Sequence, residues 1–453
     1  MNYEKILDNF IDEIKEEGTY ATKEEIREVL KDTLTTIKKY HDDTPEEIVE
    51  KIIVDNIKEL QDIKNTYPIP GFTIGVNIPN INVKMYGGDI DSLGRKMEDN
   101  TLFDIASMTK FYTQIIAYNL IKEGVFSYTD KVKDLDQRFI NVEDLTVGDV
   151  LSFTTKFRTD GRLSEKKTID EALNCLYTMS VEEKGNYNYN DMGMMLTKEL
   201  MENVTGKSYK ELFEEYIIDK LALTDTHLIV PENKIERLTG SANASKGKVN
   251  DPSALSVGGY SGHAGVFATS DDLIKLGKAV FNKKVLSEEG IKDAYTPGIK
   301  DNRGVMGNTY TSHPKGIAIS YVDKLEPLTN FVIQGSTRVQ SNIGKNSVST
   351  ILLNPASMSI ERAKEEERKI NEKRVIEGKT PVSLVKHFNF IHDAKEVEYD
   401  LIDARLIAPG EKTVEPITTS NAKLVLRLRL LNKVIEEYDK NYNKEVNIQK
   451  RIK

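Results

Sequence analysis

Strand patterns occur in two separate blocks of this chain, with a long helical stretch between them. The first block, residues 67–91, has short alternating apolar runs broken by Pro, Gly and Asn, which is typical of two strands joined in a hairpin. The second block comprises 316–322, 330–339 and 347–355, whereas 125–250 is predicted to be mostly helical. This order predicts an α+β fold, in which an antiparallel sheet is built from both ends of the chain, helices flank it, and an all-helical subdomain is inserted.

Helices are predicted at both ends of the chain. Thr22 with Glu25 and Thr44 with Glu47 form capping-box patterns, so residues 1–66 are expected to be a helical N-terminal extension. A long amphipathic helix is expected near the C-terminus. We therefore divide the chain into that extension, a central domain over 67–355 with its helical subdomain at about 125–255, and 356–453, where a charged helix, a strand and the C-terminal helix complete the domain.

The composition is that of a globular chain with a charged surface. Of 453 residues, 30% are charged, and positive and negative residues are mixed along the chain. The formal net charge is -9, which disfavours a nucleic-acid partner. The length suits one large core with additions, or two domains. Residues 1–18 lack the pattern of a signal peptide, and no run of about 18 apolar residues predicts a membrane span.

The rarer side chains narrow the function further. Cys175 is the only cysteine, so no intrachain disulfide can form, and a cytoplasmic location is expected. The expected role of Cys175 is that of a buried structural thiol. The six histidines lie far apart, without the spacing of a metal motif, so neither a metal site nor a cofactor is expected. The sequence leaves the oligomeric state open.

One Ser-x-x-Lys pair stands out by its surroundings. Six such pairs occur, so the spacing alone identifies no site. In a helix, three residues rise about 4.5 Å and complete nearly one turn, so Ser107 and Lys110 share a face. This pair follows the mostly apolar segment 102–106, whereas the other pairs lie mostly in polar, charged or loop-like segments.

Two interpretations of Ser107 follow. If Ser107 opens the helix, free backbone N–H groups there favour a developing anion, and Lys110 can act as a base where burial keeps it neutral. That chemistry also needs a dry pocket, a further proton-carrying group and an oxyanion hole. The alternative is that Ser107 is an ordinary N-cap.

Three motifs in order favour the catalytic interpretation. PIPGFTIGV followed by TLFDIASMTK resembles the opening of the serine β-lactamase-related hydrolases, a family that includes class C β-lactamases, DD-peptidases and family VIII esterases. YNYNDMGMMLTKELMENVTGKS is similar to the family's Tyr-x-Asn motif and the helix after it, and SGHAGVFATSDDL is similar to its Gly-rich stretch. The resemblance covers about residues 68–355 and implies a β-lactamase/transpeptidase-like, penicillin-binding-protein-like fold.

The resemblance also implies roles for single residues. Ser107 corresponds to the acylated nucleophile, Lys110 to the base that activates it, and Tyr189 to the group that relays protons. Asp191 stands where the family usually has asparagine. A carboxylate there could pair with Lys110 and hold it charged, which would change which group is the base. His263 is expected either at the rim of the pocket or in a structural loop.

The third family motif shows the largest departure. The family carries Lys-Thr-Gly or His-x-Gly on a strand beside the nucleophile, where the cation helps to bind a substrate carboxylate and the backbone supplies an oxyanion-hole N–H. The similar stretch here, VIQGSTRVQ, places Gln334, Gly335, Ser336 and Thr337 beside the substrate and lacks the cation. Arg338 is close, but neighbouring residues of a strand point to opposite faces. The backbone of this strand is still expected to complete the oxyanion hole.

Three functions remain open at this stage. The first is a serine hydrolase that cleaves a small ester or amide through an acyl-enzyme. The second is a penicillin-interactive enzyme, either a β-lactamase or a D-Ala carboxypeptidase, with a β-lactam-like substrate. The third is a ligand-binding scaffold of the same fold without catalysis. The missing cation and the expected cytoplasmic location favour the first, with a small molecule as substrate.

Overall fold

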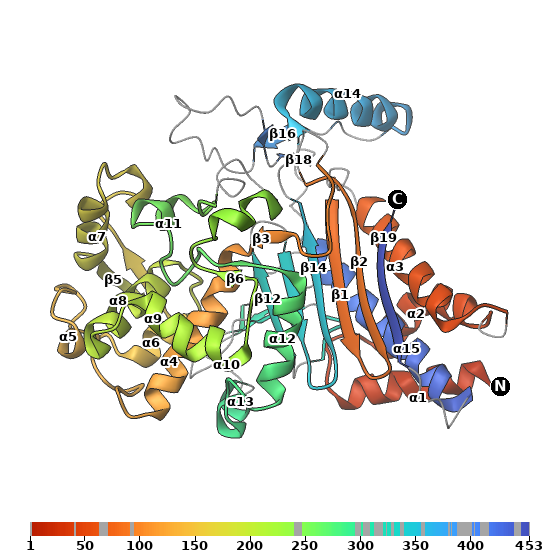
Figure 1. Ribbon diagram of the computed structural model, residues 1–453, viewed down its shortest axis with the longest axis horizontal. Helices are drawn as coiled ribbons and strands as arrows, with labels where there is room; N and C mark the ends of the chain where they lie inside the picture. Colours follow the sequence, from red (N-terminus) through yellow and green to blue (C-terminus); the bar gives the residue numbers. More distant parts are fainter. Residues whose placement is uncertain are drawn as a thin grey trace.

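A computed structural model gives the structure of the chain (Figure 1). It describes residues 2–39, 42–62, 71–90, 95–239, 247–294, 300–301, 309–311, 320–322, 324–327, 330–335, 339–354, 358–378, 381, 383–386, 401–402, 404–407, 416–438 and 445–452. Figure 1 shows a central sheet with the helical region on its left and the N-terminal helices on its right. This layering is the α+β arrangement that the sequence predicts.

The central sheet joins segments from both ends of the chain. Its strands, in spatial order, are β12 (Phe331–Gly335), β13 (Val339–Ile343), β14 (Val348–Leu353), β1 (Gly71–Ile78), β2 (Ile81–Gly88) and β19 (Val446–Ile452). In the register, Ile74 of β1 lies opposite Met85 of β2 and Ile351 of β14. Pairing is antiparallel throughout except between β2 and β19, which are parallel.

The structure corrects the predicted strands in two places. The hairpin over 67–91 is confirmed as β1 and β2, but the single strand predicted over 330–339 is wrong, because its described residues belong to two antiparallel strands, β12 and β13. Strand β19 was missed, and it makes the sheet mixed rather than purely antiparallel. Its sequence, VNIQKRI, has exposed polar positions that are typical of an edge strand and weaken the strand signal.

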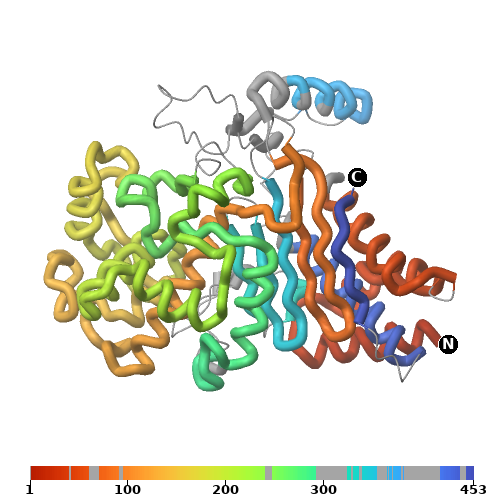
Figure 2. Tube along the Cα trace, viewed as in Figure 1, coloured from red at the N-terminus to blue at the C-terminus, as the bar shows by residue number. Residues whose placement is uncertain are grey.

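In the described part of the chain, four helices cover the outer face of the sheet. They are α1 (Tyr3–Glu16), α2 (Lys23–Ile37), α3 (Pro45–Asp62) and α15 (Pro416–Tyr438). Figure 2 shows the N-terminal helices, in red, beside the C-terminal segment, in blue. Their apolar sides share one core with the outward side chains of β1 and β2, such as Val76 and Val83. Both predicted capping boxes are confirmed, since Thr22 and Thr44 each exchange hydrogen bonds with the glutamate three residues on.

The inner face of the sheet packs against two of the described helices. These are α4 (Thr109–Lys122), preceded by a 3-10 turn over Ala106–Met108, and α12 (Ser270–Phe281). Every residue of α4 from Thr109 to Leu120 is buried. A helix buried on all sides lies between two layers. Here α4 lies between the sheet and the helical region, so residues at its start are enclosed by both.

The helical region contains short strands and turns in addition to its helices. Its helices are α5 (Val132–Leu135), α6 (Val147–Leu151), α7 (Ile169–Tyr177), α8 (Met192–Thr205), α9 (Tyr209–Phe213), α10 (Asp219–Leu221) and α11 (Pro252–Ser256), with 3-10 turns at Leu163–Glu165 and Glu232–Arg237 and a π-helical turn at Glu214–Ile218. Short strands also occur in this part: β4 (Thr155–Arg158), β5 (Ser180–Lys184), and a small sheet of β6 (Thr226–His227), β8 (Phe267–Ala268), β3 (Leu102–Asp104) and β7 (Leu238–Thr239). The predicted all-helical subdomain therefore contains strands as well.

The remaining elements lie toward the C-terminal half. They are α13 (Glu288–Ala294), α14 (Ile360–Ile376), β9 (Lys300–Asp301), β10 (Thr309–Thr311), β11 (Ser320–Val322), β15 (Met358–Ser359), β16 (Ser383–Lys386), β17 (Leu401–Ile402) and β18 (Ala404–Ile407). The predicted charged helix after 355 is α14. Cys175 in α7 is buried, as expected of a structural thiol, and burial raises the pKa of its thiol. Over the described ranges, no helix combines the length and the apolar character needed to cross a bilayer.

Candidate active site

Ser107 lies in a tight turn where β3 passes into α4. The residue before it, Ala106, has a φ of +46°, a left-handed conformation that is strained for any residue with a Cβ. The Asp104 carboxylate accepts a hydrogen bond from the Ala106 N–H at 2.8 Å. The turn therefore places the Ser107 side chain at the N-terminal end of a buried helix, where backbone N–H groups and the helix dipole favour negative charge.

Lys110 lies one turn further on and is fully enclosed. Its side chain is 2% exposed, and Nζ lies 2.9 Å from Ser107 Oγ, 2.8 Å from Asp191 Oδ1 and 3.4 Å from the carbonyl oxygen of His263. An ammonium group has three N–H donors, and three acceptors surround this nitrogen. This geometry fits a charged Lys110 that donates a hydrogen bond to Ser107 and pairs with the Asp191 carboxylate. The pairing with Asp191 agrees with the expectation from the sequence.

Asp191 is the last residue of the Tyr-x-Asp stretch and the N-cap position of helix α8. Burial opposes ionisation of its carboxyl, but the charges of Lys110 and His263 hold the pKa of Asp191 below its usual range. Its side chain is 39% exposed, so the carboxylate faces open space as well as Lys110. Asp191 is therefore a charged group at the opening of the site, where the family pattern has a neutral amide.

Tyr189 lies close to the lysine, as predicted. Its ring stacks on Phe153, with centroids 5.7 Å apart and planes 13° apart, and Lys110 Nζ lies 4.9 Å from the Tyr189 ring centroid. A cation within about 6 Å of a ring face is attracted to it. The stacking fixes the ring beside Lys110, so the structure brings Ser107, Lys110 and Tyr189 together.

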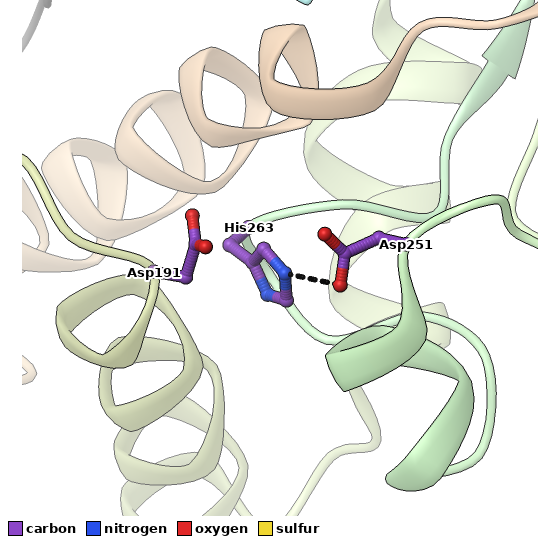
Figure 3. A group of neighbouring side chains, drawn as sticks. All are labelled: Asp191, Asp251 and His263. Carbon is purple, nitrogen blue, oxygen red and sulfur yellow. Dashed lines mark hydrogen bonds and ion pairs between the residues drawn. The ribbon is translucent and has the colours of Figure 1, made fainter. Parts of the chain in front are cut away.

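His263 lies inside the protein and not at an open rim. Its side chain is 1% exposed; Nε2 lies 3.0 Å from Asp251 Oδ1 and Nδ1 lies 2.8 Å from Ser261 Oγ. Figure 3 shows the imidazole between Asp191 on one side and Asp251 on the other. Burial opposes ionisation of Asp251, but His263 lowers the pKa of Asp251 to about 2. Of the two expected roles of His263, the structural-loop role fits a side chain held at both ring nitrogens.

The edge strand β12 approaches the nucleophile turn at Gly335. A Cβ on Gly335 would lie 2.4 Å from the carbonyl oxygen of Ile105 and 3.1 Å from Ala106 Cβ, so only glycine fits here. Alternation along the strand then puts Ile333 on the same face as Gly335 and Gln334 on the opposite face. Ile333 packs in the core with α4, which agrees with this assignment. Gln334 therefore does not share the face that approaches the nucleophile.

The motif's cation is replaced by an apolar side chain. Counting back two positions from Gly335, as in Lys-Thr-Gly, gives Ile333, which is 4% exposed. Ser336 and Thr337, predicted beside the substrate, and Arg338 lie outside the described residues. The position that would carry the cation in the family pattern is thus a buried hydrocarbon.

One group among the described residues has the spacing of a metal site. Ligand atoms of Asp191, Asp251 and His263 all lie within 4.8 Å of one another. Each of them already has a protein partner, because Asp191 pairs with Lys110 and Asp251 with His263. A second cation beside the Lys110 ammonium would meet like charge at short range. The group is better explained as the counter-charge of Lys110 than as a metal centre.

Two residues of the site were not singled out from the sequence. Asp104, in FDIAS, lies directly before the nucleophile turn, and Asp251, in NDPSAL, caps α11 through a hydrogen bond from the Ala254 N–H. An Asp-Pro pair before an apolar run is a helix-start signal, so Asp251 could have been recognised as a cap. Its contact with His263 joins residues twelve positions apart with α11 between them, and no sequence pattern predicts it.

The fold and the site together define a β-lactamase-like protein with a serine-lysine pair. A family model named Beta-lactamase matches residues 55–317, more than half of the chain, and the chain belongs to that family. It is 27% identical to the N-acetylmuramyl-L-alanine amidase of Bacillus subtilis over 242 residues, which cover 44% of this chain and 54% of that protein. It is also 27% identical to the teichoic acid D-alanine hydrolase of Staphylococcus aureus over 145 residues, 32% of this chain and 36% of that protein.

The fold is shared with solved structures as well. The structure titled EstCE1, a hydrolase with promiscuous acyltransferase activity, superposes with a TM-score of 0.56 at 14% sequence identity, covering 69% of this chain and 95% of that one. At this identity the likeness concerns the fold alone. The chain spans about half the length of the amidase and about a third of the teichoic acid hydrolase.

Proposed function

We propose that the protein is a serine hydrolase that cleaves a small ester or amide through an acyl-enzyme on Ser107. The observation that carries this proposal is the buried Lys110 Nζ at 2.9 Å from Ser107 Oγ, at the start of a helix. A serine hydroxyl becomes a nucleophile only beside a group that can take its proton. The amidase and the teichoic acid D-alanine hydrolase among its relatives support a reaction at an acyl group.

Because Lys110 is paired as an ammonium, it must release a proton as it takes one. In the proposed step, Ser107 Oγ forms a bond to the substrate carbonyl carbon, its proton passes to Lys110, and Lys110 passes one proton to the Asp191 carboxylate. The bond to the leaving group then breaks, and the leaving group takes the proton back through Lys110 and Tyr189. Water attacks the acyl-enzyme by the same proton route, which releases the acid and restores the serine.

The oxyanion of each tetrahedral intermediate needs donors close to Ser107. We assign the backbone N–H of Ser107 and an N–H at the end of β12, because Gly335 approaches the turn more closely than any residue with a Cβ could. The backbone thus supplies the electrostatic part of the proposed catalysis, while the side chains of Lys110, Asp191 and Tyr189 handle protons.

The charges of the site favour a substrate without a carboxylate. Asp191 and Asp251 are partly exposed, at 39% and 29%, and the cation position of the third motif is the apolar Ile333. A carboxylate of a β-lactam or of a peptide terminus would meet like charge there. A neutral or cationic acyl group meets no such penalty, and this favours small esters and amides.

Hydrolysis of a short p-nitrophenyl ester tests this proposal. The wild type should release p-nitrophenol, whereas Ser107→Ala should show only the background rate.

A second function has the family itself in its favour: a penicillin-interactive enzyme would form a stable adduct with labelled penicillin on Ser107. Penicillin labelling of the wild type without ester turnover would overturn the first function and support the second.

We also propose a cytoplasmic location, supported by the single cysteine. A fluorescent fusion of the full natural gene product, followed by cell fractionation, would test it. Recovery in an extracytoplasmic fraction would contradict it.

A further inference from the structure

Asp104 is a buried carboxylate beside the proposed nucleophile that the chemistry above does not use. Its residue is 3% exposed. One carboxylate oxygen accepts a hydrogen bond from the Ala106 N–H at 2.8 Å, and the other accepts from the Asn250 N–H at 2.7 Å. Buried carboxylates are unusual unless their oxygens are satisfied in this way.

These two N–H groups belong to the two halves of the site. Ala106 is the left-handed residue that turns the chain into Ser107. Asn250 precedes Asp251, which binds His263, and the His263 carbonyl oxygen in turn accepts from Lys110. One side chain therefore ties the nucleophile turn to the loop that holds the far side of the lysine.

We propose that Asp104 is a positioning residue for Ser107, which holds the strained turn and the 250–251 loop in one fixed arrangement. The inference rests on the proposed function. A left-handed alanine reverts to an ordinary conformation unless its surroundings hold it. Moving Ser107 by about 1 Å relative to Lys110 would cost about 100-fold in rate.

The arrangement requires an ionised carboxylate. A protonated carboxyl turns one of its two oxygens into an O–H donor, so it no longer accepts from both N–H groups at full strength. Burial, with a smaller contribution from Asp251, raises the pKa of Asp104 to about 6. The positioning should therefore weaken as the pH falls through about 6.

Other titratable groups of the site must be separated from Asp104. Asp104 faces the backbone of Ala106 and Asn250 and the charge of Asp251. Asp251 and Asp191 both have lowered pKa values, so they stay ionised in this range. His263 binds Asp251, and histidine is the side chain that ordinarily titrates near pH 6 to 7. A test must distinguish a pH effect of Asp104 from one of His263.

The experiment is the rate of fluorophosphonate labelling, followed by intact-protein mass from pH 5 to pH 8. For the wild type we expect a rate that falls below about pH 6. Asp104→Asn should also gain one adduct, but about 10- to 100-fold more slowly at pH 7.5. Its rate should lack the acid limb, that is, the fall in rate below about pH 6. Asp272→Asn is the matched control, because Asp272 is also buried and also accepts from a backbone N–H, that of Asp225. It should follow the wild-type profile.

The outcomes separate this inference from the proposed function. Labelling of Asp104→Asn at the wild-type rate, or with the wild-type acid limb, overturns the positioning role and leaves the hydrolase intact. No label on a folded wild type overturns the hydrolase and the positioning role with it. If Asp104→Asn does not fold, the variant His263→Asn provides the test. It keeps Asp104, so its labelling rate should still fall below about pH 6. Loss of that fall would assign the pH dependence to His263 and contradict the proposal.

Discussion

Among the described residues, two Ser-x-x-Lys pairs lie on opposite faces of the same sheet, and in only one of them does the lysine contact its serine. On the inner face, Lys110 is 2% exposed and donates to Ser107. On the outer face, in α15, Lys423 pairs with Glu59 and its side chain is 24% exposed. Ser420 instead accepts from the Asn56 side chain at 2.7 Å. The spacing is the same, yet the outer serine and lysine bind other partners.

The position in the helix explains the rest of the difference. Ser107 lies in the turn that leads into α4, where backbone N–H groups have no partner within the helix. Ser420 lies beyond the first four residues of α15, where the backbone hydrogen bonds of the helix are complete. The comparison shows that three features together distinguish the proposed nucleophile from Ser420: a lysine in contact, a helix start and an enclosed counter-charge.

The largest expected effect comes from removing the inner lysine. Lys110→Met keeps the bulk of the side chain but removes the nitrogen, so ester hydrolysis should fall by about 10³-fold in kcat/KM. Lys423→Met is the matched control at the outer pair and should leave kcat/KM unchanged. Equal losses in both variants would mean that Lys110 acts through stability alone.

The next effect sharpens the role of the counter-charge. Asp191→Asn removes the group that accepts the proton from Lys110, and kcat should fall by about 10- to 100-fold. Steady-state kinetics with one ester and a thermal melt of the variant measure this. A variant as active as the wild type would show that Lys110 works without a proton acceptor at residue 191.

On the outer face, the expected effect is on stability. Leu431 of α15 is 0% exposed and packs in the outer core. Leu431→Ala should lower the free energy of unfolding by about 2–5 kcal/mol, through lost burial and the cavity it leaves. Urea unfolding measures this, and the labelling rate of the folded variant at Ser107 should not change. A slower labelling rate would couple the outer core to the site.

A buried carboxyl on the inner face, that of Asp104, should make the stability of the protein depend on pH. Burial raises the pKa of Asp104 from 3.8 to about 6, so the folded state holds this proton more tightly than the unfolded chain. Stability from this group is therefore present below about pH 4 and is lost as the pH rises through 6, by up to about 3 kcal/mol. Unfolding of wild type and Asp104→Asn at pH 4.5 and 7 should show the variant gaining relative stability at pH 7. A constant difference would contradict the shift.

The smallest expected effect concerns the outer serine. Ser420→Ala removes the acceptor of the hydrogen bond that the buried Asn56 amide N–H donates, and it should destabilise the protein by about 1 kcal/mol, without any change in hydrolysis. Chemical unfolding and the ester assay of the same sample measure both. Loss of activity in this variant would mean that the outer pair also takes part in catalysis.

The sequence predicts the elements of this fold better than their pairing. The capping boxes at Thr22 and Thr44 and the hairpin of β1 and β2 depend on neighbouring residues, so local patterns reveal them. The pairing of β19 with β2 joins segments more than 350 residues apart, and nothing local specifies it. The sequence does not predict the split between β12 and β13, because its mixture of apolar and polar residues continues from one strand to the next.

The site shows the same limit. Ser107, Lys110 and Tyr189 can be predicted from motifs because each motif is a short continuous stretch. Asp104 contacts two backbone N–H groups and Asp251 contacts a histidine that the fold brings close, so the side-chain pattern alone does not reveal these contacts. The motif alone predicts Gln334 beside the substrate, whereas strand alternation puts it on the face away from the nucleophile turn.

The most direct test of the account is the intact mass of the protein after exposure to a fluorophosphonate. The wild type and Ser420→Ala should each gain one adduct, and Ser107→Ala should gain none. That result would show that the inner pair is activated and the outer pair is not. No adduct on a folded wild type, or an adduct that persists in Ser107→Ala, would contradict the claim that Ser107 is the nucleophile.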